Sequence, residues 1–411
     1  MVGMTTNPVL AFASAGHFIV HLLLGLHATA ALAIERDWAI DYGSIIALWT
    51  WGAFALGAAA PAAGWLADRI GAAPMMVLFF VGSGGGTVAA SFAGGPLSLS
   101  LTLASLGLFA AIYHPVGLAW LLEGMEEGQR GRAVGINGLF GSLGVAAAPA
   151  VAGLLSDSWD WRTAYLVPGL VSIAFGLLLA VLLLRGQISV GRRADTFSHD
   201  APAMDDRSAP AGALLWLAVS MICSSLLYAA FTTALPKWAE TKVIAFWPHA
   251  DLGAIGLIVG IVFLVGGVGQ VLAGHLSDRH DPRQIYVWTL ASKPALVLAA
   301  AFLAGPLGLF AAALTILAMD VTSPSESLLL ARWTPTNRRS FAFGIRHAIA
   351  LAAAPAGVWL AAVSHGTAGG LRSLFIGLAC LAIVATCAAM LLPKDRHPAR
   401  SVLTASSLRK R

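Results

Sequence analysis

The chain has 411 residues, of which 58% are hydrophobic and only 11% are charged, and its mean hydropathy is +0.79. A soluble protein of this length needs far more surface charge to stay dispersed, so this composition excludes an ordinary soluble domain. The three cysteines lie in apolar runs and indicate neither a disulfide framework nor a cysteine metal site.

Apolar runs long enough to cross a bilayer recur along the whole sequence. A helix needs about 20 such residues to span about 30 Å of hydrocarbon. The first run is too long for the core of a cleavable signal peptide and follows no basic segment, so we expect it to span the membrane. Twelve spans are predicted in two sets of six: 9–34, 42–63, 73–93, 96–121, 132–155 and 162–184, then 212–236, 252–274, 284–304, 306–332, 339–363 and 370–392.

The segment 185–211 lies between the two sets and differs from them in kind. It is rich in charged residues and holds few large apolar ones. We therefore expect it to form a solvated linker between an N-terminal bundle, 1–184, and a C-terminal bundle, 212–393. The basic tail, 394–411, is expected to be disordered.

The distribution of positive charge predicts the orientation in the membrane. An even number of spans places both termini on one side, where 18 of the 25 Lys and Arg residues fall, against five on the other side. Positive residues favour the cytoplasmic side, so we expect both termini, the linker and the tail in the cytoplasm of a bacterial-type inner membrane. The basic balance is thus a sign of topology, and no nucleic-acid partner is expected.

Two short blocks recur at nearly the same offset in the two halves. Gly64-Trp65-Leu66-Ala67-Asp68-Arg69 and Gly274-His275-Leu276-Ser277-Asp278-Arg279 are 210 residues apart, and each is expected in the loop after the second span of its half. Pro115 pairs with Pro324, and Asn137 with Arg346, at an offset of 209. Duplication is the simplest explanation. A parallel repeat with a cavity between the halves is the architecture expected of an alternating-access carrier.

The repeated G-x-L-[AS]-D-R block resembles the signature loop of the major facilitator superfamily, and the resemblance extends over the whole chain in span count, repeat and linker. It implies an all-α membrane protein with twelve transmembrane helices in two pseudo-symmetric six-helix bundles around a central cavity. It also implies a conformational latch on the cytoplasmic side, in which the Asp residues cap a helix N-terminus and pair with Arg69, Arg130 or Arg132. The latch residues would be Gly64, Asp68, Arg69, Gly274, Asp278 and Arg279.

The sequence departs from the full pattern of that family. Gly71 is followed by Ala72-Ala73-Pro74 in place of basic residues, and Asp281-Pro282 replaces the glycine of the second copy. A narrower resemblance links Gly16-His17-Phe18 and Tyr113-His114-Pro115 to the fosmidomycin-resistance-type subgroup, which exports small drugs against protons. That subgroup usually has an Asp four residues after the first His, where this chain has His21.

Four charged residues fall well inside the predicted spans, and all belong to the second half: Lys293, Asp320, Glu326 and Arg346. Charges at this depth are costly and normally face a cavity or a partner. Asp320 and Glu326 are candidates for proton coupling, with an ion pair to Lys293 or Arg346 as the alternative. Arg346 could bind an anionic substrate through its planar guanidinium, whereas Lys293 is assigned a structural role. On a straight helix Asp320 and Glu326 would differ by about 120° and could not point the same way.

The first half carries histidines where the second carries charges. His17 and His21 share one helix face at i,i+4 spacing, and the family resemblance places them, with His114, in cavity-lining spans. They are candidates for substrate or proton binding, or for a metal; hydrogen bonds between helices are the alternative. His347, beside Arg346, is a further candidate, Asn137 is an interhelix hydrogen-bond donor or a substrate ligand, and His27 is expected at the outer interface.

The function predicted from these features is secondary active transport by alternating access. The first hypothesis is proton-coupled efflux of a small compound, with anions among the candidate substrates. Import or facilitated passage of an organic anion, transition-metal uptake, and a non-transporting membrane sensor or assembly factor are the alternatives. The sequence contains no P-loop, no G-x-S-x-G turn and no zinc signature. We therefore expect no enzyme activity and no cofactor. The expected partners of the monomer are the substrate, protons and the bilayer.

Overall fold

The computed structural model describes residues 7–189, 212–277, 279–335 and 339–394. Within these ranges the chain is helical and forms no strand. Twelve helical segments are long and apolar enough to cross a membrane, which confirms the predicted spans. The helices are α1 (Pro8–Trp38), α2 (Tyr42–Ala47), α3 (Thr50–Ile70), α4 (Ala72–Ser91), α5 (Pro96–Ala110), α6 (Tyr113–Glu123), α7 (Arg130–Ser158), α8 (Trp161–Leu184), α9 (Ala213–Phe246), α10 (Leu252–Ser277), α11 (Pro282–Phe302), α12 (Gly305–Trp333), α13 (Arg339–His365) and α14 (Gly370–Met390).

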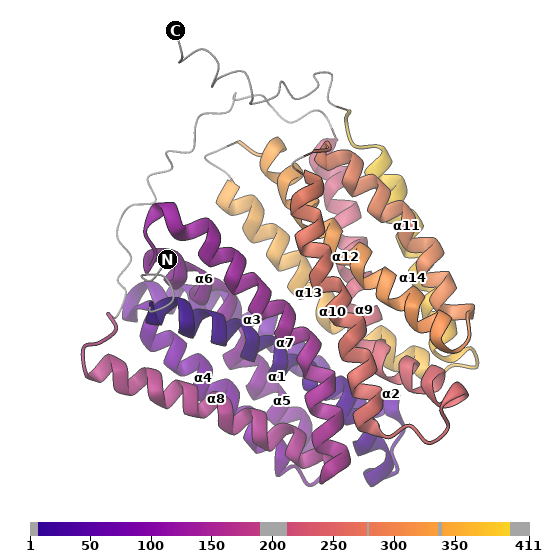
Figure 1. Ribbon diagram of the computed structural model, residues 1–411, viewed down its shortest axis with the longest axis horizontal. Coiled ribbons are helices and arrows are strands. Elements are labelled where there is room, and N and C mark those ends of the chain that lie inside the picture. The colour runs from indigo at the N-terminus through magenta and orange to yellow at the C-terminus, as the bar shows by residue number, and fades with distance from the viewer. Residues whose placement is uncertain (1–6, 190–211, 278, 336–338, 395–411) are drawn as a thin grey trace.

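Helices α1 to α8 form one bundle and α9 to α14 form the other (Figure 1). The second and fourth spans are each divided, into α2 and α3 and into α5 and α6. The break in the fourth span falls at Ala111 and Ile112, just before Pro115. A proline has no N–H to donate to the carbonyl four residues earlier, so the helix is interrupted there, as its sequence predicts.

The signature motif does not form a loop, contrary to the sequence-based expectation. Gly64 and Arg69 both belong to α3, and Gly71 alone separates this helix from α4, with a φ of 93° that glycine adopts without strain. In the second copy, α10 continues to Ser277, while Asp278 lies outside the described residues. The same holds for most of the predicted linker and tail, namely 190–211 and 395–411.

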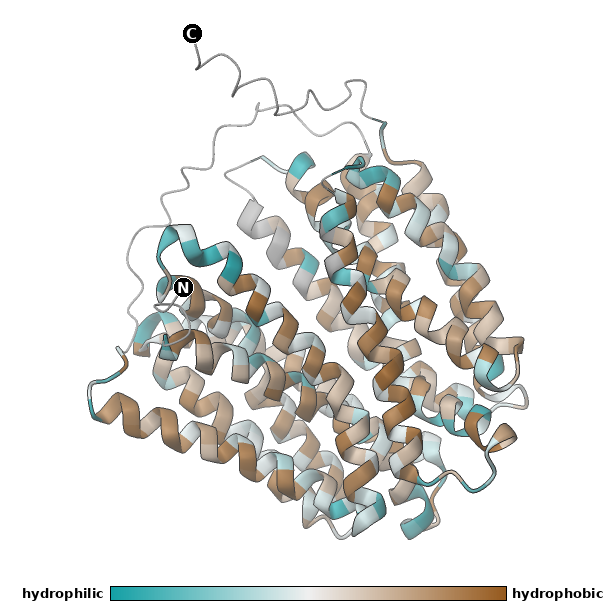
Figure 2. Cartoon of the chain, viewed as in Figure 1, coloured by the Kyte–Doolittle hydropathy of each residue, from teal (hydrophilic) through white to brown (hydrophobic). Residues whose placement is uncertain are grey.

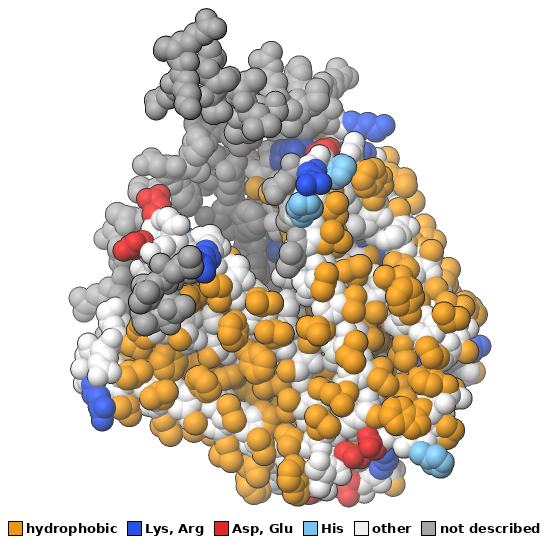
Figure 3. Space-filling model, in the orientation of Figure 1, with side chains coloured by type: hydrophobic (Ala, Val, Ile, Leu, Met, Phe, Trp, Pro, Cys, Tyr) orange, Lys and Arg blue, Asp and Glu red, His pale blue; other side chains and the backbone are white. Residues whose placement is uncertain are grey.

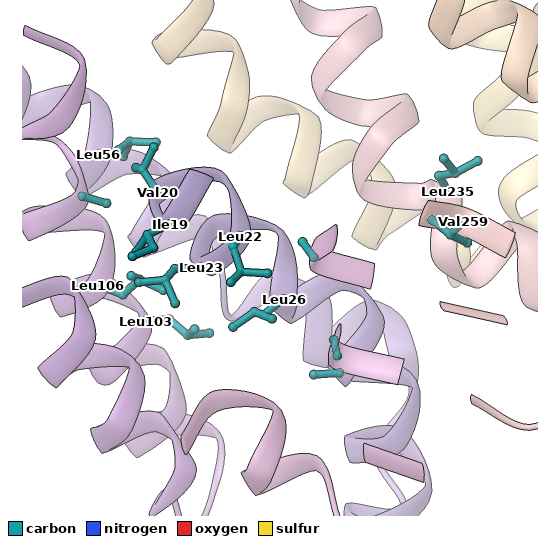
Figure 4. Close-up of a cluster of buried hydrophobic side chains, with 14 of the residues drawn as sticks. Ile19, Val20, Leu22, Leu23, Leu26, Leu56, Leu103, Leu106, Leu235 and Val259 are labelled. Carbon is teal, nitrogen blue, oxygen red and sulfur yellow. The ribbon is translucent and has the colours of Figure 1, made fainter. Parts of the chain in front are cut away.

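Apolar side chains cover the flank of the molecule in a broad band, whereas charged side chains gather at its two ends (Figures 2 and 3). Many large apolar side chains of the described helices are exposed, such as Leu97, Leu184 and Phe310. Such a surface suits the hydrocarbon core of a bilayer. The interior is equally apolar, because Leu23 and Leu26 of α1 pack among neighbouring helices (Figure 4).

We call the end where α1 begins and α14 ends the terminal face, and the opposite end the distal face. The two halves splay apart toward the terminal face (Figure 1).

Between α7 and α10, small residues bring the two helix backbones into contact: a Cβ added at Gly260 would lie 2.7 Å from the carbonyl oxygen of Ala146. Close approach of this kind is what glycine and alanine provide between membrane helices.

Four charged residues join the bundles at the distal face, and we call them the distal ion cluster: Glu35 and Arg36 of α1, with Lys237 and Glu240 of α9. Lys237 Nζ lies 2.6 Å from Glu35 Oε2 and 2.8 Å from Glu240 Oε2. The seventh span was predicted to end at 236, but α9 continues to Phe246 and carries this cluster on its last turns. Ion pairs therefore hold the two bundles together at the distal face, whereas the helices of the two halves splay apart toward the terminal face.

Candidate functional site

A cavity of about 530 Å³ lies between the two bundles, about midway along the spans. Both halves contribute to its wall, which is apolar over much of its area and includes Leu24 and Leu56 of the first bundle and Phe263 and Leu351 of the second. Ionisable side chains interrupt this apolar wall: His21, His27, His114, Tyr228, Lys293, Asp320, Glu326 and Arg346. This composition suits a binding site for a small polar solute.

The strongest polar contact in the cavity wall joins α12 to α13. Arg346 Nε lies 2.8 Å from Glu326 Oε1, and Arg346 Nη2 donates to Ser323 Oγ at 2.9 Å. Both charged side chains are largely buried, with 18% of Arg346 and 11% of Glu326 exposed. A guanidinium holds two partners in a fixed plane, so Arg346 ties α13 to two points of α12. The predicted alternative for these residues, an ion pair, is thus present.

Asp320 occupies a pocket made by the helices around α12. Gly266 of α10 lies so close that an added Cβ would come within 2.5 Å of Asp320 Oδ2. Lys293 of α11 and Tyr228 of α9 both interact electrostatically with this carboxylate. Asp320 and Glu326 both line the cavity, although their six-residue spacing predicted different directions. The cavity is wide enough to reach both, and α12 contains Pro324 between them.

The histidines of the first bundle form a compact group. The ring centroids of His21 and His114 lie 5.5 Å apart, and those of His17 and His114 5.9 Å apart. His17 Nδ1 donates to the carbonyl oxygen of Asn137 at 2.8 Å, which leaves its Nε2 to accept from His21 Nε2 at 3.2 Å. The i,i+4 spacing predicted that His17 and His21 lie together, whereas His114 was expected beside the cavity from the family resemblance alone.

His17 and Asn137 do not belong to the cavity wall, in contrast to their place among the candidate substrate ligands. His17 stacks on Tyr113, with 5.1 Å between ring centroids. Asn137 is buried and donates through Nδ2 to Tyr113 Oη at 2.9 Å, while Tyr113 donates to the carbonyl oxygen of Ala13. These two residues therefore hold α1, α6 and α7 together and support the wall from behind.

The metal hypothesis finds no support in the arrangement of the described residues. Among them, no group of three or more His, Cys, Asp or Glu side chains is placed to hold a metal ion. The two Nε2 atoms of His17 and His21 face each other at hydrogen-bond distance, so they share a proton.

His27 lies in the protein interior, which corrects the expectation that it is interfacial. It is 2% exposed, and its Nε2 donates to the carbonyl oxygen of Ile45 at 3.0 Å. Its Nδ1 then accepts from Tyr165 Oη at 2.7 Å. His27 thus joins α1, α2 and α8 near the distal face, and a buried ring with both nitrogens paired needs no contact with the membrane surface.

The motif residues of the first half lie far from the cavity, at the terminal end of α3. Arg69 donates to the carbonyl oxygen of Trp65 at 3.1 Å and stacks over the Trp65 ring at 3.5 Å. Arg130, one of the partners proposed for Asp68, donates to the carbonyl oxygens of Leu122 and Met125. In the second copy of the motif, Arg279 is exposed and Asp278 lies outside the described residues. The side chain of His347, a separate candidate on α13, also lies outside the described part of the chain.

Sequence reasoning missed two residues of the site. Lys293 was assigned a structural role because the ninth span was expected at the periphery, yet its side chain lines the cavity. Tyr228 of α9 also lines the cavity and carried no signal, since a single tyrosine in an apolar span is unremarkable. A charge in an apolar span was a sufficient signal for Lys293.

Two helical bundles around a central cavity, joined by ion pairs at the distal face, define the fold of a membrane carrier. The chain belongs to the Major Facilitator Superfamily, whose family model matches residues 13–246 and 217–410. This family and the solved structures of the same fold are transporters and not enzymes, which agrees with the prediction from the sequence. Substrates differ widely among its relatives.

Similar proteins of known name include transporters and efflux pumps. The chain is 27% identical over 225 residues to the "Probable sulfoacetate transporter SauU" of Cupriavidus necator, covering 53% of this chain and 52% of that one. It is 27% identical over 232 residues to an "MFS-type efflux pump" of Mycolicibacterium smegmatis, covering 54% of this chain and 49% of that one. The chain thus spans about half the length of the curated relatives it matches.

Solved structures with the same fold cover nearly the whole chain. A bacterial homolog to the human lysosomal transporter Spinster, in an inward-facing and occupied conformation, superposes with a TM-score of 0.76 at 13% identity, covering 94% of this chain and 96% of that one. A peptide transporter in complex with alafosfalin gives a TM-score of 0.74 at 14% identity, with 93% of each chain covered. At such low identity the likeness concerns the fold alone.

Proposed function

We propose that this chain is a secondary active transporter that carries a small organic anion together with protons by alternating access. The observation that supports this proposal is the pair of Arg346 and Glu326 in the cavity wall, with 2.8 Å between Nε and Oε1. A guanidinium is the side chain best suited to a carboxylate or sulfonate. Here it is held by a carboxylate that a substrate could replace.

The pair provides a physical link between substrate and proton. When an anion binds Arg346, Glu326 loses its counter-charge inside the membrane region, where an unpaired carboxylate is costly. Taking up a proton removes that cost, so anion and proton bind together. Release of the proton restores the carboxylate, which recaptures Arg346 and expels the anion. Because the anion and the proton bind together, they cross the membrane in the same direction. This coupling favours uptake of the anion over the efflux expected from the sequence.

The names of the relatives support anion transport in one case and efflux in others. One is named a probable sulfoacetate transporter, and its substrate is an organic anion. Others are named an efflux pump and multidrug resistance protein B homologs. Proton-coupled efflux is therefore the second candidate, and the apolar part of the cavity wall is the feature that favours it.

The orientation proposed for the protein follows from its charge. With both termini in the cytoplasm of a bacterial-type inner membrane, the terminal face opens inward, and the structure is an inward-facing state of a monomer. The latch residues Asp68 and Arg69 lie at the terminal face, where they would act when that face closes. Asp320 remains a second candidate for a proton site.

The test is transport by purified protein in lipid vesicles with a pH-sensitive dye inside and an imposed pH gradient. A panel of small carboxylates and sulfonates is added, and proton movement is followed with each. We expect an added anion to carry protons with it into the vesicle. Proton movement opposite to the anion would establish efflux by exchange and overturn the cotransport proposal.

Two variants locate the coupling in the Arg346 and Glu326 pair. Arg346→Gln should abolish anion binding, and Glu326→Gln should keep binding while reducing the dependence of binding on pH. Glu127→Gln, on the exposed turn before α7, is the matched control and should behave as the unmodified protein. Unchanged pH dependence in Glu326→Gln would remove this residue as the coupling site.

A further inference from the structure

Lys293 is the cavity residue that the preceding account leaves unused. It lies on α11, which packs against α12 and α14 on the outer side of the second bundle. Its side chain is nevertheless 2% exposed and reaches the cavity wall. One turn away, Thr322 of α12 donates to Thr289 of α11 at 3.2 Å, so this face of α11 is pressed against the cavity helix.

The ammonium group of Lys293 has no close counter-charge. Within the described part of the chain it makes no hydrogen bond, and no carboxylate oxygen lies within 4.0 Å of it. Its electrostatic partners, Asp320 and Glu326, are both more distant than an ion pair. Burying a cation in this way is costly. A purely structural lysine would offset that cost with a direct ion pair, whereas a lysine kept for a ligand would remain free.

We infer that Lys293 is a substrate-binding residue that, together with Arg346, makes this cavity a site for a small dianion. The inference rests on the proposed function and deepens it by naming the substrate class. A dicarboxylate or a sulfonate with a second carboxylate group has the required chemistry. One acidic group would take the planar guanidinium of Arg346, and the other would take the ammonium of Lys293 as a point charge.

The charges of the cavity balance for such a ligand. The groups that face Lys293 are Asp320 and Glu326 from α12 and Arg346 from α13, with Tyr228 of α9 beside Asp320 and His21 and His114 across the cavity. With both carboxylates ionised and the histidines neutral, the empty site has no net charge. A bound dianion restores neutrality only when Asp320 and Glu326 each take up a proton. Two protons are therefore expected to accompany each dianion.

The experiment compares matched dianions and monoanions. Malonate, succinate, glutarate and sulfoacetate are the dianionic probes, and acetate, propionate and butyrate are their monoanionic counterparts. Affinity is measured by the ligand-induced rise in melting temperature and by uptake into vesicles. The unmodified protein should bind at least one dianion at least about tenfold more tightly than its monoanionic counterpart, the difference that one further charged contact supplies. Equal affinity for both sets would overturn the inference.

Variants at position 293 test the residue itself. Lys293→Gln should lose the preference for dianions while still binding monoanions through Arg346, and Lys293→Arg should retain the preference. A preference that persists in Lys293→Gln at unchanged melting temperature would contradict a binding role. If Lys293→Gln does not fold, the test uses Lys293→Arg and the unmodified protein. Both must then prefer dianions, and a lack of this preference in either one contradicts the inference.

The outcomes separate this inference from the proposed function. Suppose that Arg346→Gln loses all anion binding while Lys293→Gln keeps its preference for dianions. This outcome contradicts the binding role of Lys293 and remains consistent with the proposed anion transport. Normal anion binding in Arg346→Gln removes the proposed function and the dianion site with it. Proton counts made at the same time should give two protons per dianion and one per monoanion.

Discussion

Arg36 Nη2 lies 2.6 Å from Glu240 Oε1 and thereby joins the first helix of one bundle to the first helix of the other. Glu240 is 6% exposed, and its second oxygen accepts from Lys237, which in turn reaches Glu35. Three ion pairs thus close the distal face with charges of alternating sign. Two of these pairs, Arg36 with Glu240 and Glu35 with Lys237, each join one bundle to the other. These two pairs must therefore break when the distal face opens.

Weakening the distal ion cluster should shift the protein toward the state that is open at the distal face. Arg36→Gln leaves Glu240 with one partner, and we expect the population of that state to rise about tenfold, the change that about 1.4 kcal/mol produces. A cysteine introduced at Thr233, in the cavity wall, reports opening through its rate of labelling by a thiol reagent applied at the distal side. The native cysteines are replaced for this assay.

Arg162→Gln is the matched control for the distal cluster. Arg162 lies 3.6 Å from Asp37, but both belong to the first bundle, so their contact survives opening. The control should label at the rate of the unmodified protein. Equal labelling rates in Arg36→Gln and Arg162→Gln would show that the cluster does not hold the distal face shut.

Gly266 sets the space available to Asp320. A Cβ at this position would lie 2.5 Å from Asp320 Oδ2 and 2.5 Å from Ile316 Cγ2, distances that force the carboxylate or the helix to move. We expect Gly266→Ala to reduce transport by at least about tenfold, since displacing a charged group in a site by about 1 Å has effects of this size. Vesicle uptake checks the prediction.

The neighbouring glycine provides the control. A Cβ at Gly267 would lie 3.4 Å from Ser142 Cβ, an ordinary contact, so Gly267→Ala should transport normally. Should Gly266→Ala also transport normally, Asp320 would have to be mobile or dispensable, and its candidacy as a proton site would end.

The fold could be predicted because the local sequence is sufficient to identify a membrane-spanning helix. Each span is a long apolar run, and the repeat at Pro115 and Pro324 relates the two halves. The ends of the helices were less predictable. Charged residues such as Lys237 and Glu240 suggested a loop after the seventh span, whereas pairing with α1 lets α9 carry them on its own surface. That stabilisation comes from another part of the chain and leaves no local signal.

The candidate site was predictable in its residue types and not in its partnerships. Rare ionisable side chains in apolar spans marked Arg346, Glu326 and Asp320, and all three line the cavity. The sequence left open which acid pairs with Arg346, because that choice depends on how α12 and α13 are rotated about their axes. His17 was expected to line the cavity together with His21, yet its ring bonds to the carbonyl oxygen of Asn137, and of the two histidines only His21 is part of the cavity lining.

The guanidinium geometry of Arg346 should matter beyond its charge. Nε and Nη2 contact Glu326 and Ser323 separately, and a lysine has a single nitrogen that cannot reach both in this way. We expect Arg346→Lys to weaken anion binding about tenfold, whereas Ser323→Ala, which removes one neutral partner, should weaken it by less than about threefold. Binding is measured by the rise in melting temperature with added anion; equal affinities in Arg346→Lys and the unmodified protein would mean that only the charge is recognised.

His27 should contribute to stability and not to transport chemistry. His27→Ala would leave the carbonyl oxygen of Ile45 and the hydroxyl of Tyr165 buried without this partner, at a cost of about 2–4 kcal/mol. Tyr165→Phe removes only one of the two bonds and should cost about 1 kcal/mol. Thermal unfolding in detergent measures both, with His249→Ala on the exposed turn before α10 as the control. An unfolding temperature unchanged in His27→Ala would place His27 in contact with solvent or lipid after all, as its position near the end of the first span suggested.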